Sequence, residues 1–227
     1  MKNYLCWNEK KVSSLDDNTI TSLYNEGYVF TRLGKGVMHQ IRSLRVDLSK
    51  FELTSENRRI LRKTDGLQLT AYSLPLTDYH WSIGKMAKNF YDTKFGSGTM
   101  SANKVKELLT DPQRSNFNTL LTYVIPSKAR DDGIGYAVCY ANDQIIHYAY
   151  PFYNLTPNTY NLTPNIGLGI MLRAILYAQE QGKRYIYLGS ARRPSDVYKL
   201  QFSGLEWFDG KEWQNDIALL KKQLQQS

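Results

Sequence analysis

Short apolar segments and one long helical segment follow one another in the second half of the chain. Segments 120–125, 133–141 and 144–152 are rich in β-branched and aromatic residues, which predicts three strands, the last two joined by a turn. Apolar residues recur at helical spacing over 166–181, and Gly182 follows as at the end of a helix. Beyond it we expect a strand at 184–188, a short helix at 195–202, a hairpin at 205–213 and a polar final helix.

The first half of the chain predicts more helix than strand. Thr54 or Ser55 can cap a helix that carries Glu56 in its first turn and Arg62 and Lys63 in its last, an order that the helix dipole favours. Gly66 closes this helix. The other expected elements are a helix from Asp16 to Gly27, strands at 28–31 and 45–51, and helices at 77–92 and 101–109.

The order of these elements predicts the fold class. One helix connects the strand at 144–152 with the strand at 184–188, and such a crossover requires the two strands to run parallel. Antiparallel strands precede them and a hairpin follows. We therefore expect an α/β (α+β) fold with a mixed sheet and flanking helices, in a single domain over 1–227. Its helical and basic part covers 1–115, and its core sheet and donor cleft cover 116–227.

Composition excludes several classes of protein. No apolar run approaches the roughly 20 residues of a membrane-spanning helix, and the N-terminal lysines are not followed by the apolar segment of a secretory signal. The two cysteines, Cys6 and Cys139, are too few for a disulfide framework or a structural zinc site. The three histidines lie far apart and have no ligand spacing. We expect a cytoplasmic protein with no metal and no membrane partner.

Positive charge is concentrated in one part of the chain. The sequence has 29 Lys and Arg against 21 Asp and Glu, and its net charge of +8 favours polyanionic partners. Half of this excess lies between residues 42 and 63. A helix there places residues 58 and 62 in one row and 59 and 63 in the next, either as a solvated face or as a site for phosphates. The candidate phosphate-binding residues are Arg42, Arg45, Arg58, Arg59, Arg62 and Lys63.

Two glycines, Gly167 and Gly169, open the helix that connects the parallel strands. Glycine lets a ligand approach the backbone, and the first N–H groups of a helix can bind a phosphate. The alternative is that both glycines serve only close helix packing. Their position resembles that of the phosphate-binding loop in acetyltransferases of the GNAT superfamily, which makes them candidate phosphate-binding residues.

Two blocks of sequence resemble one family of enzymes. The run from Ile41 to Lys63 is similar to the signature of arginyl- and leucyl-tRNA–protein transferases, in which an Arg-Val-x-Val run and a Phe precede Ser-x-x-Arg-Arg-x-Leu-Arg. A second block, 185–189 followed by Tyr198-Lys199-x-x-Phe202 and Trp207, resembles the family's Tyr-Leu-Gly and Tyr-Lys elements. The likeness extends over residues 28–214. It implies a GNAT-like fold whose central parallel strands splay at the donor site, and transfer of an amino acid from aminoacyl-tRNA to the α-amine of an acceptor protein.

Such a transfer needs a neutral amine, a positioned carbonyl and a site for the tetrahedral oxyanion. We expect backbone N–H groups from Tyr150 to Tyr153 to bind the oxyanion, where the parallel strands diverge. Tyr198 is the candidate acid for the leaving oxygen, or else a core aromatic residue. Lys199 is the candidate partner of a phosphate or of the acceptor carboxylate, or else part of a surface salt bridge. Asp196 fits a helix cap better than a catalytic role.

Three functions remain open on the sequence alone. The first is an aminoacyl-tRNA-dependent transferase with no bound cofactor, for which aminoacyl-tRNA is the co-substrate and a protein or peptide N-terminus the acceptor. The second is a GNAT acyltransferase that uses acyl-CoA on an amine. The third is an RNA-binding relative that has kept the basic face and lost the chemistry.

Overall fold

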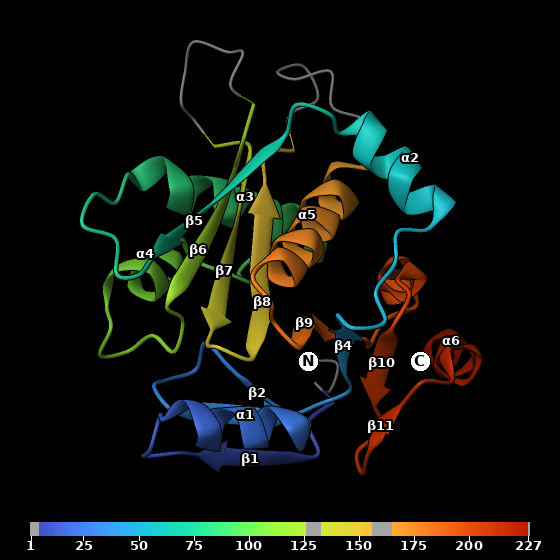
Figure 1. Cartoon of the computed structure of the whole chain (residues 1–227). Coiled ribbons are helices and arrows are strands. Elements are labelled where there is room, and N and C mark those ends of the chain that lie inside the picture. The colour runs from blue at the N-terminus through green and yellow to red at the C-terminus, as the bar shows by residue number, and fades with distance from the viewer. Residues whose placement is uncertain (1–4, 126–132, 156–164, 227) are drawn as a thin grey trace.

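The largest feature of the computed structural model is a mixed β-sheet of eight strands (Figure 1). The structure describes residues 5–125, 133–155 and 165–226. The strands lie side by side in the order β11-β10-β4-β9-β8-β7-β6-β5. They are β4 (Ser43–Asp47), β5 (Gln68–Ser73), β6 (Thr119–Val124), β7 (Gly135–Ala141), β8 (Ile145–Tyr153), β9 (Tyr185–Ser190), β10 (Leu205–Phe208) and β11 (Trp213–Gln214).

Helices surround this sheet, and a second, small sheet lies beneath it in Figure 1. The small sheet has the order β1-β3-β2, with β1 (Asn8–Lys11), β2 (Tyr28–Phe30) and β3 (Val37–Gln40). The helices are α1 (Asp17–Asn25), α2 (Ser55–Lys63), α3 (Trp81–Phe95), α4 (Ala102–Thr110), α5 (Ile166–Glu180), the 3₁₀ segment η2 (Pro194–Gln201) and α6 (Ile217–Gln225). None of these described helices has both the length and the apolar character needed to cross a bilayer.

The parallel pair predicted from the sequence is confirmed. β8 and β9 run parallel in the middle of the sheet, and α5 is the helix between them. The neighbouring pairs on both sides are antiparallel. The predicted GNAT-like mixed sheet with flanking helices is therefore the fold observed. Strands β4 and β5 come from residues before 115, so the sheet extends across the predicted division at that residue.

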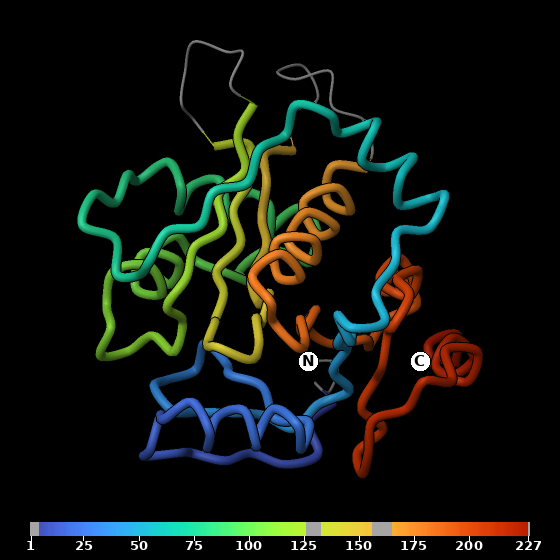
Figure 2. The backbone as a smooth tube through the Cα atoms, viewed as in Figure 1, coloured from blue at the N-terminus to red at the C-terminus, as the bar shows by residue number. Residues whose placement is uncertain are grey.

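The two faces of the sheet carry different helices. One apolar cluster joins the sheet to α5, α2 and α6, and a second joins it to α1, α3 and α4. In Figure 2 the tube of α5 crosses in front of the central strands, and α2 lies beside its N-terminal end. The carboxyl ends of β8 and β9 are thus reached by helices from both faces.

Several boundaries differ from the sequence prediction for physical reasons. Thr54 caps α2 as expected, because its hydroxyl accepts from the Asn57 N–H and the Asn57 side chain accepts from the Thr54 N–H. Helix α3 begins at Trp81 rather than at residue 77, with His80 as its N-cap. Strand β5 is missed by the sequence analysis because its segment 68–73 is mostly polar and forms an edge. The repeat-containing loop at 153–165 lies mainly outside the described residues.

Candidate active site

The central parallel strands diverge as the sequence analysis expected. Their paired residues end at His147 and Tyr187, whereas β8 continues to Tyr153 and β9 to Ser190. Beyond this point β8 pairs only with β7, and β9 only with β4. We call the region between the two unpaired strand ends the divergence point.

Two residues beyond the last pair disfavour an extension of the ladder. Pro151 lies in the unpaired part of β8 and has no N–H to donate to a neighbouring strand. Gly189 near the end of β9 has a φ of 77°, which turns that strand away from an extended course. The divergence is therefore encoded locally in both strands.

The direction of the backbone reduces the number of N–H groups in Tyr150–Tyr153 that could bind an oxyanion at the predicted site. The Asn154 N–H donates to the Ile134 carbonyl at 2.9 Å, so it faces the β7 side. Successive N–H groups of a strand alternate in direction. The N–H groups of Phe152 and Tyr150 therefore also point toward β7, and the N–H of Tyr153 points toward the divergence point. Pro151, which faces the same way as Tyr153, offers only a carbonyl. The Tyr153 N–H is thus the one donor that this segment directs to the divergence point.

Tyrosine side chains gather around the divergence point. The Tyr153 ring packs on Phe90 with centroids 4.7 Å apart, and burial raises the pKa of its hydroxyl. On β8 the buried Tyr148 hydroxyl lies beside the equally buried Tyr123 hydroxyl, and burial raises the pKa of both. From α3, the Tyr91 hydroxyl donates to the Pro151 carbonyl at 3.1 Å. These phenols are neutral at physiological pH and can donate protons.

Tyr198 joins this group from η2, the segment that follows β9. Its residue surface is 44% exposed, yet its hydroxyl lies among protein groups: burial first, and then the charge of Asp196 and the neighbouring Tyr153, raise its pKa. The same hydroxyl also influences Tyr91 and Tyr148. Tyr198 is therefore a neutral phenol at the mouth of the divergence point, which fits the predicted acid better than a core aromatic residue.

Lys199 is fixed at the end of β9. Its ammonium group donates to the Ser190 carbonyl at 2.9 Å and lies 3.8 Å from an Asp196 carboxylate oxygen. Burial lowers the pKa of Lys199, and Asp196 opposes that shift. Asp196 also accepts from the Arg192 and Arg193 N–H groups at 2.9 Å each, which is the capping role expected for it. Lys199 thus lies inside the fold beside the site and not in a surface salt bridge.

Unsatisfied polar atoms lie next to the end of β9. Ser43 pairs with Ser190 across the β4–β9 ladder, and its buried hydroxyl has no partner within the described residues. The Arg42 carbonyl accepts from the Ala191 N–H, and the buried Nε of Arg42 is also without a partner there. Burial lowers the pKa of Arg42. A buried polar group without a partner is costly, so both atoms are energetically unfavourable in the structure described here.

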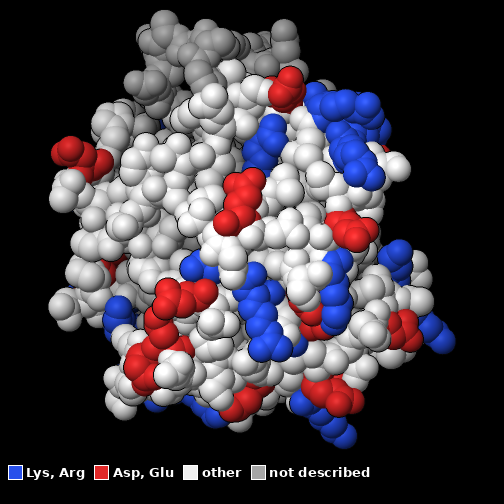
Figure 3. Space-filling model, in the orientation of Figure 1, with Lys and Arg blue, Asp and Glu red and all other residues white. Residues whose placement is uncertain are grey.

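The basic row of α2 lies on the surface, at the upper right of Figure 3. Arg58, Arg62 and Lys63 are exposed and form no ion pair among the described residues. We call these three residues the α2 patch. Arg59 differs because it binds the carboxylate of Glu56 one turn earlier. The α2 patch is therefore the part of the predicted phosphate site that is free to bind.

Arg45 does not belong to that site, contrary to the sequence prediction. It is 7% exposed, and its guanidinium is stacked between the rings of Tyr185 and Trp213, each centroid 3.9 Å away. Its Nε donates to Glu206 at 2.8 Å. A residue in strand β4 alternates between the faces of the sheet, so a basic residue there can be buried as readily as exposed. Arg45 stabilises the fold and cannot contact a nucleic acid.

The two glycines of α5 pack closely on their neighbours. A Cβ at Gly167 would lie 2.8 Å from the Tyr153 hydroxyl, and one at Gly169 would lie 2.6 Å from the Thr64 methyl group. Arg173 also donates to the Thr64 carbonyl, at 2.6 Å. The α2 patch is thus connected to the divergence point through Thr64 and the first turn of α5. The helix N-cap, Asn165, makes no side-chain hydrogen bond to that turn.

A cavity of about 520 Å³ borders the other side of the divergence point. It lies between α3 and the end of β8, and its wall combines apolar and polar side chains. Its lining includes Lys85, Met86, Asn89, Phe90, Tyr153 and Leu155. In the part of the chain that the structure describes, no group of three His, Cys, Asp or Glu residues could hold a metal ion.

Comparison with known proteins agrees with these features. The sequence is 28% identical over 176 residues to an aspartate/glutamate leucyltransferase of Ruegeria pomeroyi, covering 76% of this chain and 61% of that protein. It is 27% identical over 216 residues to one of Saccharophagus degradans, covering 88% and 84%. The chain is thus similar in sequence to aspartate/glutamate leucyltransferases. No protein-family model matches the sequence.

Solved structures resemble this chain more distantly. L-PGS from Bacillus licheniformis has a TM-score of 0.46 and 10% identity, over 92% of this chain and 70% of that one. A GCN5-related glucosamine N-acetyltransferase region of a fungal multi-domain β-N-acetylglucosaminidase has a TM-score of 0.44 and 11% identity, over 87% and 22%. The GNAT-like assignment rests on the strand order and the crossover helix described above.

Sequence reasoning missed three polar groups around this candidate site: Arg32, the Ser43 hydroxyl and the Tyr91 hydroxyl. Arg32 lies between β2 and β3, outside the basic run from residue 42 to residue 63. Tyr91 is one of 17 tyrosines, and nothing in its neighbours distinguishes it. Only the fold brings these groups to the ends of β8 and β9.

Proposed function

We propose that this chain is an aminoacyl-tRNA-dependent transferase that moves an amino acid onto the α-amine of an acceptor protein. Leucine is the donor amino acid and an N-terminal aspartate or glutamate the acceptor, as the names of the relatives indicate. The observation that carries the proposal is the connection of the exposed α2 patch, through α5, with the diverging ends of β8 and β9. The matched region spans only 61% of the Ruegeria protein.

The arrangement suits a donor with a phosphate backbone. The α2 patch presents three cations that no carboxylate among the described residues neutralises, and phosphates bind such rows with release of counterions. Only the first turn of α5 separates the α2 patch from Tyr153. A helix with its side chains is about 10 Å across, so the separation is of that order. A tRNA acceptor stem on α2 can therefore deliver its 3′ end to the divergence point.

The chemistry follows from the groups on β8 and η2. The neutral acceptor amine attacks the ester carbonyl carbon, forming a C–N bond and a tetrahedral oxyanion that the Tyr153 N–H stabilises. The intermediate collapses with cleavage of the bond to the ribose oxygen. Tyr198 protonates that oxygen, and the proton released from the amine returns to Tyr198. Lys199 stabilises the negative charge of the tetrahedral oxyanion. The reaction requires no bound cofactor.

A second candidate, acyl transfer from acyl-CoA, is favoured by one observation. The first turn of α5 lies at the divergence point without a side-chain cap, and such helix starts bind pyrophosphate. Stabilisation of the protein by CoA, with none by tRNA, would favour this reaction.

Transfer assays distinguish the candidates. The purified chain is incubated with radiolabelled leucyl-, arginyl- or phenylalanyl-tRNA and peptides that begin with Asp, Glu or Ala. We expect label from leucyl-tRNA on the acidic peptides, and a loss of about a hundredfold in kcat for Tyr198→Phe at unchanged tRNA affinity. Absence of label from all three donors contradicts the proposal. Salt-sensitive tRNA binding without transfer would indicate an RNA-binding protein that has lost the chemistry.

A cytoplasmic location belongs to the same proposal, because charged tRNA is available there. The proposed location and the proposed acceptor are both inferred from the transfer reaction, and no contact within the fold supports either of them directly.

A further inference from the structure

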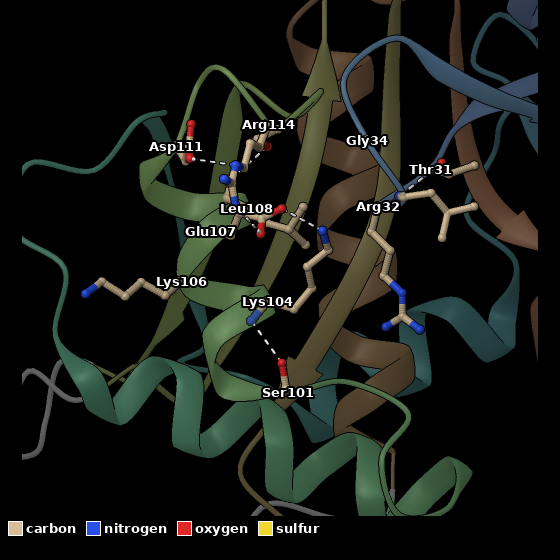
Figure 4. Close-up of polar contacts among 12 residues, drawn as sticks. Thr31, Arg32, Gly34, Ser101, Lys104, Lys106, Glu107, Leu108, Asp111 and Arg114 are labelled. Carbon is tan, nitrogen blue, oxygen red and sulfur yellow. Dashed lines mark hydrogen bonds and ion pairs between the residues drawn. The ribbon is translucent and has the colours of Figure 1, made fainter. Parts of the chain in front are cut away.

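Arg32 is a half-buried cation whose charge no carboxylate balances. It forms no ion pair among the described residues, and its guanidinium donates to the Met100 sulfur at 3.0 Å. A thioether is a weak acceptor, and a guanidinium has five N–H donors. Figure 4 shows Arg32 extending away from the ion pairs that Glu107 and Asp111 form on α4. Its donors are therefore available to a ligand.

The backbone that carries Arg32 is held firmly. The amide group of buried Asn116 donates to the carbonyls of Thr31 and Gly34 at 3.0 and 2.7 Å. Its oxygen accepts from the Gly36 N–H at 2.6 Å. One side chain thus fixes both ends of the loop between β2 and β3. A guanidinium on such a loop is positioned before any ligand arrives, which lowers the entropic cost of binding.

Arg32 is linked to the end of β8 through Tyr91 of α3. The Tyr91 hydroxyl bonds to the Pro151 carbonyl in the unpaired part of that strand. Burial raises the pKa of Tyr91, and the nearby charge of Arg32 opposes the shift. Tyr91 belongs to α3, on the face of the sheet opposite to α5 and α2. The cation and the α2 patch thus approach the divergence point from opposite faces.

This separation assigns different substrates to the two faces. If tRNA occupies α2 and the first turn of α5, the acceptor must reach the carbonyl from the α3 side. An arginine fork binds a carboxylate through two parallel hydrogen bonds, and a half-buried one discriminates strongly against a neutral amide. We infer that Arg32 is the specificity-determining residue that binds the side-chain carboxylate of the acceptor's first residue. The inference rests on the proposed function and adds the residue that selects the acceptor.

The test compares two peptides that differ only in beginning with Glu or Gln. For the wild-type chain we expect kcat/KM of leucyl transfer to favour the Glu peptide by roughly tenfold or more, which is the scale of one charged hydrogen-bonded contact. Arg32→Met should bring this ratio close to one, mainly through KM for the Glu peptide. Arg32→Lys keeps the positive charge but loses the two parallel N–H donors of the guanidinium. Its Glu-to-Gln ratio of kcat/KM should lie between those of the wild type and Arg32→Met. The affinity for leucyl-tRNA should not change.

Lys106→Met is the matched control, because it removes an exposed cation from neighbouring α4 (Figure 4). It should leave the Glu-to-Gln ratio as in the wild type. Circular dichroism and thermal melting confirm that each variant is folded. A ratio that survives in Arg32→Met, or no preference in the wild type, overturns the inference. A fall in tRNA affinity with the ratio intact assigns Arg32 to nucleic-acid binding instead and overturns it too.

Direct peptide binding separates this inference from the proposed function. Fluorescence anisotropy measures the affinity of labelled Glu and Gln peptides without any donor. If no charged tRNA supports transfer but the Glu peptide still binds more tightly in an Arg32-dependent way, the proposed donor is wrong and the acceptor site stands. If transfer occurs and peptide binding shows no dependence on Arg32, the acceptor site is wrong and the proposed function stands.

Discussion

Arg45 and Arg58 belong to the same basic run of sequence and have opposite environments. Arg45 is stacked between two aromatic rings and bound to Glu206, whereas Arg58 is exposed on α2. Helical spacing predicts the exposure of Arg58, because a row of charges on one helix face must face solvent. The burial of Arg45 could not be predicted, since its partners come from β9 and the C-terminal hairpin. Individual site residues were thus predictable only where local periodicity decides their direction.

His147 gives a residue-scale prediction about pH. It lies in β8 with its Nδ1 2.8 Å from the Tyr24 hydroxyl, and burial lowers its pKa to about 3 from 6.5. The unfolded chain therefore binds a proton between these values that the folded chain does not, and acidification favours unfolding. We expect the free energy of unfolding to lose about 2 kcal/mol between pH 7 and pH 5 because of this residue.

Urea denaturation at both pH values measures this loss. His147→Gln serves as the control, because it cannot titrate in this range while all carboxylates remain. Its loss of stability between pH 7 and pH 5 should be smaller by that amount. An equal loss in both proteins would show that His147 is protonated in the folded state.

At the scale of elements, the helices, the central strands and the C-terminal hairpin were predictable, and three strands of the first half of the chain were not. Capping residues and apolar spacing placed α1, α2, α4 and α5 within a few residues of their ends. Strands β1, β3 and β5 were missed because their stability comes from pairing with distant segments. The packing of α2 on α5 was also not predictable from the sequence, although it fixes the position of the α2 patch relative to α5.

Gly169→Ala tests that packing. The added methyl group meets Thr64, and overpacking of this kind costs about 1–3 kcal/mol, offset by about 1 kcal/mol of improved helix propensity. We expect a net loss of about 1 kcal/mol in the free energy of unfolding. In a Thr64→Ala background the same substitution should cost nothing or stabilise, as a double-mutant cycle by urea denaturation can show. Equal effects in both backgrounds would contradict the packing described here.

On the scale of the whole molecule, the sheet separates two charged regions that meet only at the divergence point. The α2 patch lies on the face of α5, and Arg32 on the face of α3. Net charge alone predicts a polyanionic partner but not this division. The parallel pairing of β8 and β9, which the sequence did predict, is what brings the ends of these strands between the two regions.

Salt dependence of tRNA binding tests the first region. Replacing Arg58, Arg62 and Lys63 together with Gln should weaken binding and lower the slope of log Kd against log salt by about one for each phosphate that is no longer bound. Lys221→Gln with Lys222→Gln removes exposed charge from α6 and should leave the slope nearly unchanged. Filter binding over a range of salt concentrations measures both. A slope that does not respond to the triple substitution would reduce the α2 patch to solvated surface charge.

Pro151 has a consequence for how durable the site is. Sheets tend to extend by pairing free strand edges, and β9 offers such an edge only one strand away. Because the missing amide hydrogen is a covalent property of proline, a ladder that closed over this segment would always lack one donor. The chain's composition at this position therefore disfavours closure of the two strand ends whether or not a substrate is bound.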